Sequence, residues 1–314
     1  MQVAPLYEDV ADAPTGGKAW WVTAGDGIRL RVAIWPATDR GRRAGTVLLF
    51  PGRTEYVEKY GRVAQVFTRH GYAVLTLDWR GQGLSDRLLP ERRLGHIRHF
   101  ADYQRDVATL LNVAESRALS GPFFLVAHSM GGCIGLRALH DGLPVAAAAF
   151  SAPMWGVHMS AREWLLARVI AFFGPMIGLG NRPPPGQTLE SQLVAEPFEG
   201  NDLTSDRATW DFMKAQIDRY PDLALGGPSL YWLRAALLET ARLSPKPPPD
   251  VPVLTYLGSN ERVVSPAAIR RRMACWPGGR LEIVPGAEHE IMMERAEVRD
   301  AFLAEAHALF VAQS

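Results

Sequence analysis

The sequence predicts an α/β fold built on a mostly parallel sheet that is flanked by helices. Three observations lead to this expectation. Short, continuous apolar runs alternate with helix-like segments along most of the 314 residues. Two strand-like segments precede these runs, the second with apolar/polar alternation, and a long helix-like stretch interrupts the runs late in the chain. Together these patterns predict a doubly wound sheet with a helical insertion.

The first two strands are expected at residues 19–23 and 28–35, on either side of a short turn. In the second strand, apolar residues at even positions alternate with Arg29 and Arg31, which predicts one buried side and one side that faces solvent. We therefore expect an antiparallel opening hairpin. Residues 1–17 carry no such pattern and are expected to form an arm.

Later apolar runs are typical of strands buried on both faces, and helices are expected between them. The strands are expected at residues 46–50, 73–77, 123–128, 145–150, 251–257 and 281–284. The helices are expected before residue 70 and at residues 100–119, 130–140, 266–274 and 298–311.

The alternation stops between residues 153 and 245, where helix-like segments and Pro/Gly-rich turns replace it. The insertion lies between two late strands, over the carboxyl ends of the sheet, where ligands bind in such folds. We interpret residues 153–245 as a helical cap, or lid. Residues 1–152 and 246–314 are then the two parts of the core.

The composition indicates an ordinary globular protein, because 47% of the residues are hydrophobic, 21% are charged and the formal net charge is +1. This charge gives no reason to expect a nucleic acid partner. The two cysteines, Cys133 and Cys275, lie far apart, which fits a reducing compartment and predicts neither a disulfide framework nor a metal site. No signal-peptide pattern is visible at the N-terminus, so a cytoplasmic protein is expected. The oligomeric state stays open.

A candidate nucleophile follows the strand at residues 123–128. The run ends at Ser129 and a helix pattern begins, which is the strand–turn–helix context of a nucleophile elbow. The positions two before and two after this serine must be small, and Ala127 and Gly131 meet that need. Glycine is more usual at the first position, and alanine lacks its freedom at positive φ. The alternative is a serine that caps an ordinary helix.

A serine needs a base, and the base needs an acid that orients it. Three histidines lie beyond the helix expected at residues 130–140, and His289 is the candidate because its loop directly follows the last predicted strand. His158 begins the cap and His307 lies in the terminal helix, where surface or packing roles are expected. The candidate acid is Glu261, the only carboxylate in the loop after residues 251–257.

Glu261 also has a simpler interpretation, a surface ion pair with its neighbour Arg262. An oxyanion hole needs two backbone N–H donors. We expect one from Met130, at the helix N-terminus, and one from Arg53, through its N–H and not its guanidinium. No cluster has the spacing of metal ligands, so neither a metal nor a cofactor is expected.

These residues and motifs resemble the α/β-hydrolase superfamily, and within it the monoacylglycerol lipase and bacterial lysophospholipase L2 group. The resemblance covers nearly the whole chain from about Trp20, and Pro51, Ala127 and the glutamate acid are similar to the L2 branch. The motifs that carry it are Pro51-Gly52-Arg53-Thr54-Glu55, Asp78-Trp79-Arg80-Gly81-Gln82-Gly83-Leu84-Ser85, Ala127-His128-Ser129-Met130-Gly131-Gly132, Ala152-Pro153-Met154, Gly226-Gly227-Pro228, Glu261-Arg262-Val263-Val264 and Gly286-Ala287-Glu288-His289-Glu290-Ile291.

The resemblance implies a serine hydrolase that cleaves carboxylic esters of single-chain lipids, a lysophospholipid or a monoacylglycerol, through an acyl-enzyme on Ser129. The alternatives are a short-chain carboxylesterase of the same fold and a catalytically silent lipid-binding protein. An aminopeptidase needs cap carboxylates to hold a substrate ammonium, and the sequence leaves their placement open. The carboxylates available are Glu163, Glu190, Glu196 and Glu199.

The first part of the cap is strongly apolar, which fits an acyl-chain tunnel or a face that contacts a membrane transiently. The simpler interpretation, a core between cap and sheet, is expected for most of its apolar residues. These are Met154, Trp155, Met159, Trp164, Leu165, Leu166, Val169, Ile170, Phe172, Phe173, Met176 and Ile177. A loop with Arg87, Arg92, Arg93 and Arg98 is expected to be either solvated or an attractor of anionic lipid at the inner face of the membrane.

Overall fold

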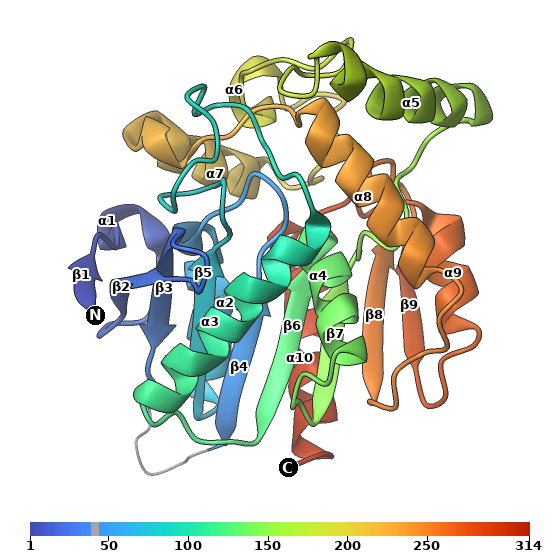
Figure 1. The fold of residues 1–314 in the computed structure, drawn as a ribbon. Coiled ribbons are helices and arrows are strands. Elements are labelled where there is room, and N and C mark those ends of the chain that lie inside the picture. The colour runs from blue at the N-terminus through green and yellow to red at the C-terminus, as the bar shows by residue number, and fades with distance from the viewer. Residues whose placement is uncertain (39–43) are drawn as a thin grey trace.

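The computed structural model describes residues 1–38 and 44–314, which form one sheet with helices on both faces (Figure 1). The strands are β1 Gln2–Ala4, β2 Lys18–Thr23, β3 Arg29–Trp35, β4 Gly45–Phe50, β5 Tyr72–Asp78, β6 Phe123–His128, β7 Ala147–Ser151, β8 Val253–Gly258 and β9 Arg280–Val284. The α-helices are α1 Glu8–Ala11, α2 Gly61–Arg69, α3 Tyr103–Ser116, α4 Ser129–His140, α5 Ala161–Phe173, α6 Gln192–Ala195, α7 Arg207–Arg219, α8 Leu230–Leu243, α9 Pro266–Met273 and α10 Ala296–Val311. The 3-10 helices are η1 Val57–Tyr60, η2 Phe100–Asp102, η3 Gly174–Ile177, η4 Pro221–Leu223 and η5 Ile291–Met293.

The strand order in the sheet is β1-β2-β3-β5-β4-β6-β7-β8-β9. The pairs from β1 to β5 are antiparallel, and the pairs from β5 to β9 are parallel. The predicted hairpin and the mostly parallel sheet are therefore confirmed. The expected arm is wrong in part, because β1 pairs with β2 and extends the hairpin. The three residue pairs between β1 and β2 are held by backbone hydrogen bonds, so this strand requires no apolar pattern in the sequence from which it could be predicted.

One face of β3 was expected to meet solvent, and the structure shows that this is wrong. Only Arg29 of the strand is exposed, while the Arg31 guanidinium is fully buried. Its Nε donates to Asp78 Oδ2 and its Nη1 and Nη2 donate to the two carboxylate oxygens of Glu58, each at 2.7 Å. Burial of this cation is compensated because both acidic partners are fully buried beside it.

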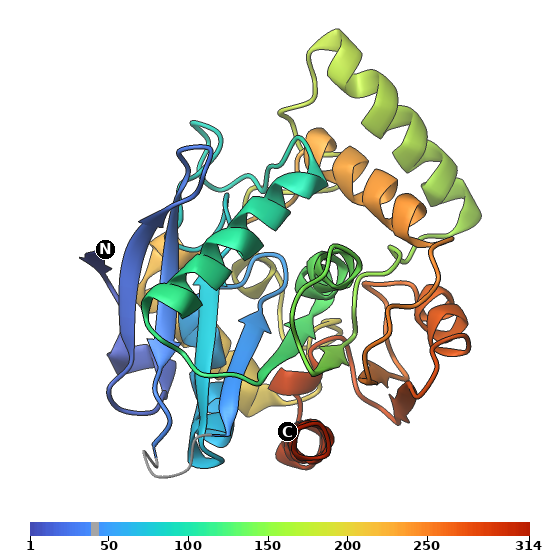
Figure 2. The same cartoon turned by 60° about the horizontal axis from the view of Figure 1, so that its bottom comes forward.

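The continuous apolar run of β4 reflects burial on both faces of the sheet. Leu48 and Phe50 pack in the core beneath α3 and α4, whereas Val47 and Leu49 pack in the second core beneath α2 and α10. Figures 1 and 2 show α3 and α4 on one face of the sheet and α10 on the other. Such two-sided burial anchors the strand ends from which the candidate site residues project.

Helices α5 to α8 lie between β7 and β8 in the chain and above the sheet in Figure 1. We use the name cap for residues 153–245, whose role as a lid stays a prediction. Gly226 and Ser229 of the cap donate backbone hydrogen bonds to the carbonyls of Arg93 and Gly95 in the core. None of the described helices has both the length and the apolar character required to cross a bilayer.

Candidate active site

The candidate nucleophile lies at a sharp turn between β6 and α4. Ser129 has φ 48°, in the left-handed region that residues other than glycine rarely adopt. A Cβ added at Gly131 would collide with the carbonyl oxygens of Phe50 and Pro51, and Ala127 is fully buried. The close approach of α4 to the end of β4 therefore explains why the position two residues after Ser129 is a glycine.

The structure brings together the three residues proposed as nucleophile, base and acid. Ser129 Oγ lies 2.9 Å from His289 Nε2, and His289 Nδ1 lies 2.7 Å from Glu261 Oε2. The three residues follow β6, β9 and β8, whose carboxyl ends meet at one edge of the sheet. This geometry allows a proton to pass from the serine hydroxyl to an imidazole that a carboxylate orients.

Glu261 is held in place by the backbone of its own loop. Its second oxygen accepts the N–H groups of Val263 and Val264 at 2.7 and 2.9 Å. The Glu261 side chain is fully buried, and Arg262 pairs instead with Glu288 at 3.3 Å. The interpretation as a surface ion pair with Arg262 is therefore wrong.

The interaction between His289 and Glu261 shifts the pKa values of both side chains. Burial alone lowers the pKa of His289, but the adjacent Glu261 carboxylate outweighs it and raises that pKa above its ordinary value. Burial raises the pKa of Glu261, while His289 and the two backbone N–H donors lower it more. Glu261 thus stays ionised and favours a protonated His289.

The two residues expected to form an oxyanion hole lie beside Ser129 in the same cavity. Met130 follows Ser129 at the N-terminus of α4. The Arg53 guanidinium donates to the carbonyl of Gly226 in the cap at 2.8 Å, so the side chain connects the loop after β4 to the cap. The roles of the Met130 and Arg53 N–H groups stay predictions.

Ser129 lines a cavity of about 480 Å³ whose wall comes from both the core and the cap. Its size is in the range of small-molecule sites. The cap and the loop after β8 contribute many apolar side chains to its wall. These include Met154, Val157, Met159, Leu166, Ile170, Leu193, Trp232, Leu233, Val263 and Val264.

The apolar residues of the first cap segment do not share one environment. Met154 and Trp155 are buried in the core, as expected, and Met154 also lines the cavity. For several others the expected core position is wrong, because these side chains are exposed on α5 and η3. They are Trp164, Leu165, Leu166, Val169, Phe173, Met176 and Ile177.

The arginine-rich loop is only partly solvated. Arg92, Arg93 and Arg98 are exposed, as a solvated loop requires. Arg87 is different, since it donates to the carbonyls of Gly81, Asp222 and Ala224. Its guanidinium joins core to cap and is not available as a ligand for lipid head groups.

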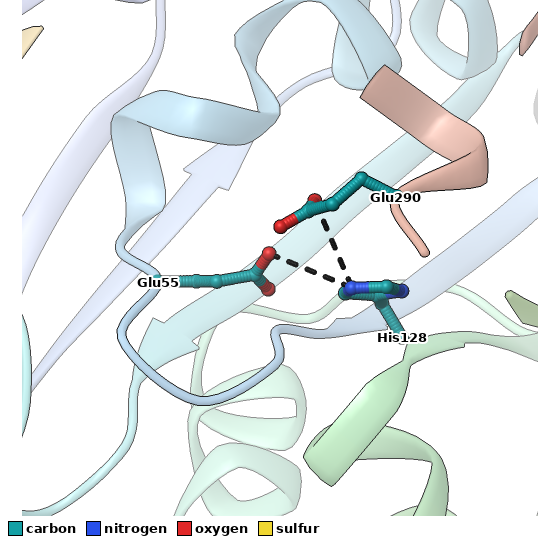
Figure 3. A group of neighbouring side chains, drawn as sticks. All are labelled: Glu55, His128 and Glu290. Carbon is teal, nitrogen blue, oxygen red and sulfur yellow. Dashed lines mark ion pairs between the residues drawn. The ribbon is translucent and has the colours of Figure 1, made fainter. Parts of the chain in front are cut away.

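A buried group of charges lies next to His289, and sequence reasoning missed it. Lys59 Nζ donates to Glu55 Oε1 at 2.6 Å and to both oxygens of Glu290 at 2.7 Å. His128 Nε2 lies 3.8 Å from Glu55 and 3.7 Å from Glu290, as Figure 3 shows. The adjacency of Glu290 to His289 was the one signal in the sequence, because Glu55 and Lys59 come from the distant segment after β4, with Lys59 in η1.

Glu55, His128 and Glu290 offer ligand atoms within 4.8 Å of one another, an arrangement that a metal ion could use. Spacing along the chain did not reveal this group. The Lys59 ammonium already contacts both carboxylates and supplies the compensating positive charge. Burial lowers the pKa of His128 to about 3, so its ring stays neutral.

The sequence of this chain is similar to those of several known proteins. The family model described as "Serine aminopeptidase, S33" matches residues 41–296. Lysophospholipase L2 of Escherichia coli K12 is 30% identical over 302 residues, which cover 90% of this chain and 84% of that protein. The probable lysophospholipase L2 of Haemophilus influenzae is 29% identical over 256 residues, which cover 81% of this chain and 79% of that protein.

Among solved structures, a soluble variant of monoglyceride lipase from Saccharomyces cerevisiae superposes with a TM-score of 0.75. The alignment covers 99% of this chain and 100% of that chain at 21% identity, so it shows a common fold. The elbow, the sheet order and the family match agree with one another. The chain belongs to the serine aminopeptidase S33 family of α/β hydrolases.

Proposed function

We propose that the protein hydrolyses carboxylic esters of single-chain lipids, a lysophospholipid or a monoacylglycerol, through an acyl-enzyme on Ser129. The observation that carries the proposal is the hydrogen-bonded series Ser129–His289–Glu261 beside a cavity to which the cap contributes many apolar side chains. The relatives named lysophospholipase L2 support the same class of substrate. The apolar cap wall suits one acyl chain.

The chemistry follows from the proposed roles of these residues. Ser129 Oγ attacks the ester carbonyl while its proton passes to His289 Nε2, and the backbone N–H groups of Met130 and Arg53 stabilise the oxyanion. Collapse of this intermediate breaks the ester C–O bond, and His289 gives its proton to the leaving alkoxide. Water then loses a proton to His289 and attacks the acyl-enzyme, which releases the fatty acid and restores Ser129.

The acyl-length preference tests the substrate class. Hydrolysis of p-nitrophenyl esters from acetate to palmitate is expected to give the highest kcat/KM for long chains, because the cavity wall is apolar along the cap. Lysophosphatidylcholine and monoacylglycerol are assayed alongside to identify the head group. A maximum at acetate or butyrate, with neither lipid cleaved, would contradict the proposal and indicate a short-chain esterase.

An aminopeptidase is the less favoured activity. Of the cap carboxylates considered for a substrate ammonium, Glu163 is the one that lines the described cavity. Its Oε2 accepts the N–H of Ser160 at 2.8 Å and so caps α5. Amino-acid p-nitroanilides in the same assay separate the two activities.

The pH profile of kcat/KM tests the proposed base. His289 accepts a proton only when neutral, so kcat/KM is expected to rise with pH and reach a plateau. Its midpoint is expected above the ordinary histidine pKa, because the Glu261 carboxylate raises the pKa of His289. Glu261→Gln removes that charge and is expected to shift the midpoint to lower pH. An unchanged midpoint in this variant would count against the pairing.

We also propose that the exposed apolar surface of α5 and η3 contacts lipid membranes. Phe173, Met176 and Ile177 are 61, 76 and 74% exposed, and Leu166, which lies on the same helix as Phe173, lines the cavity. Several large apolar side chains that are exposed on neighbouring elements are typical of an interaction site. Contact through it would bring the cavity next to the bilayer that holds the substrate. A cytoplasmic location at the inner face of the membrane stays the expectation from the sequence.

Co-sedimentation with phosphatidylcholine/phosphatidylglycerol vesicles tests this contact. The double variant Phe173→Ser/Met176→Ser is expected to partition at least about tenfold less, because each side chain loses burial in lipid. The matched control Val3→Ser/Val311→Ser removes two exposed apolar residues elsewhere and is expected to bind like the unaltered protein. Equal loss in both variants would contradict a specific membrane face.

A further inference from the structure

A second cavity, of about 360 Å³, lies between the cap helices α5 and α8 and the core helix α9. Figures 1 and 2 show these three helices on the same side of the molecule. Trp164, Arg168 and Phe172 line it from α5 at intervals of four residues, so they share one helical face. The cavity is separate from the one that contains Ser129, and none of the proposed catalytic residues lines it.

The walls of the second cavity combine apolar surface with positive charge. Arg168 and Arg271 are its charged residues, and no carboxylate lines it within the described part of the chain. The Arg168 guanidinium carbon lies 4.5 Å from the centroid of the Trp164 ring, which positions the cation beside an apolar surface. An amphipathic anion complements such walls, because its chain is buried while its head pairs with arginine.

The two cavities share part of their wall. Val157 and Met159 line both of them. Val157 also forms an antiparallel bridge with Val264, whose N–H donates to the carboxylate of Glu261. A ligand in the second cavity would therefore contact the segment that separates this cavity from the one that contains Ser129.

We propose that the second cavity binds a long-chain fatty acid, with its chain on the apolar walls and its carboxylate at Arg168 and Arg271. The identity of this ligand rests on the proposed function, since hydrolysis of a lipid ester releases a fatty acid next to the shared wall. Glycerol or a monoacylglycerol has no anionic group for the two arginines, and the glycerophosphodiester released from a lysophospholipid has no acyl chain for the apolar walls. The site thus holds product outside the catalytic cavity.

Binding of oleate to the Ser129→Ala protein, measured by calorimetry, tests the proposal without turnover. The variant Arg168→Gln/Arg271→Gln, made in the same background, is expected to bind oleate at least about tenfold more weakly. The matched control Arg162→Gln/Arg270→Gln removes the same charge from the same two helices, at positions that line neither cavity. It is expected to keep the affinity of the parent.

Further probes distinguish the contribution of the carboxylate to binding from that of the acyl chain and from that of other anionic groups. Oleyl alcohol is expected to bind at least about tenfold more weakly than oleate and to be indifferent to the arginine substitutions. A diazirine-labelled fatty acid is expected to crosslink to residues of α5 or α9 at the second cavity, and to lose these crosslinks in the Arg168→Gln/Arg271→Gln variant. Equal oleate affinity in both double variants, or crosslinks confined to the first cavity, would overturn the proposal. Tighter binding of 1-oleoyl-lysophosphatidate than of oleate would overturn the assignment to a carboxylate.

These outcomes are independent of the enzymatic assay. Arginine-dependent oleate binding without lipid hydrolysis would refute the proposed function and leave the binding site in place. Lipid hydrolysis with arginine-independent oleate binding would refute this site alone.

Discussion

Ser129→Ala is expected to lower kcat for a lipid ester by about 10⁴-fold or more, with little change in the thermal unfolding midpoint. The substitution removes the hydroxyl that lies 2.9 Å from His289 Nε2, and with it the atom that would form the acyl-enzyme. The alanine side chain would have to tolerate the same left-handed backbone, at a cost similar to that of serine. Steady-state kinetics measures the loss of kcat, calorimetry measures the unfolding midpoint, and a fluorophosphonate reports whether the reactive hydroxyl is present.

Ser151 provides a matched control for this substitution. It is also a buried serine at the end of a strand, and its Oγ lies 3.0 Å from His128 Nδ1 and not from His289. Ser151→Ala is expected to keep fluorophosphonate labelling and most of the activity. Residual activity of the Ser129→Ala variant above about one per cent of the parent would exclude Ser129 as the nucleophile.

Lys59→Met is expected to lower the free energy of unfolding by about 3–5 kcal/mol at pH 8. The ammonium is the cation between Glu55 and Glu290, and its removal leaves two buried carboxylates uncompensated. Their pKa values then rise in the native state but not in the unfolded chain, so the native state binds more protons. The loss of stability should therefore be smaller at pH 5 than at pH 8, which urea unfolding at both values measures.

Lys214→Met is the control, because Lys214 also pairs with an acid four residues away, Asp218 at 2.9 Å, but on the surface. An exposed pair of this kind contributes only about 0.3–0.5 kcal/mol. A Lys59→Met protein no less stable than Lys214→Met would show that the buried charges are compensated in another way.

The parts of the fold that follow from local sequence could be predicted. The strand β4 is buried on both faces, so its residues form a continuous apolar run, which is typical of a central parallel strand. The turn at Ser129 is also local, because the residues that must be small lie within two positions of it. Glu261 and His289 could be proposed because each lies in a loop directly after a predicted strand.

The features that could not be predicted depend on contacts between residues that are distant in sequence. The Arg31 side chain is buried because Glu58 and Asp78 meet it, and periodicity alone assigns an arginine to the solvent side. Lys59 and Glu290 likewise come from opposite parts of the chain. The exposed face of α5 was unpredictable for a different reason, since apolar patterning records hydrophobicity and not whether protein or lipid covers it.

The position of the cap has a consequence for folding kinetics. Strands β7 and β8 are paired neighbours, as in the register Ser151↔Tyr256, yet residues 152–252 separate them in the chain. Closing so long a loop costs little extra free energy, about 0.6 kcal/mol for each doubling of its length, but it delays the pairing. Glu261 and His289 lie beyond this junction, so chains that emerge from the ribosome complete the triad geometry only in a late step of folding. A partly folded chain would then display the unpaired edge of β7, a site for association with other chains, before it holds the residues proposed for catalysis.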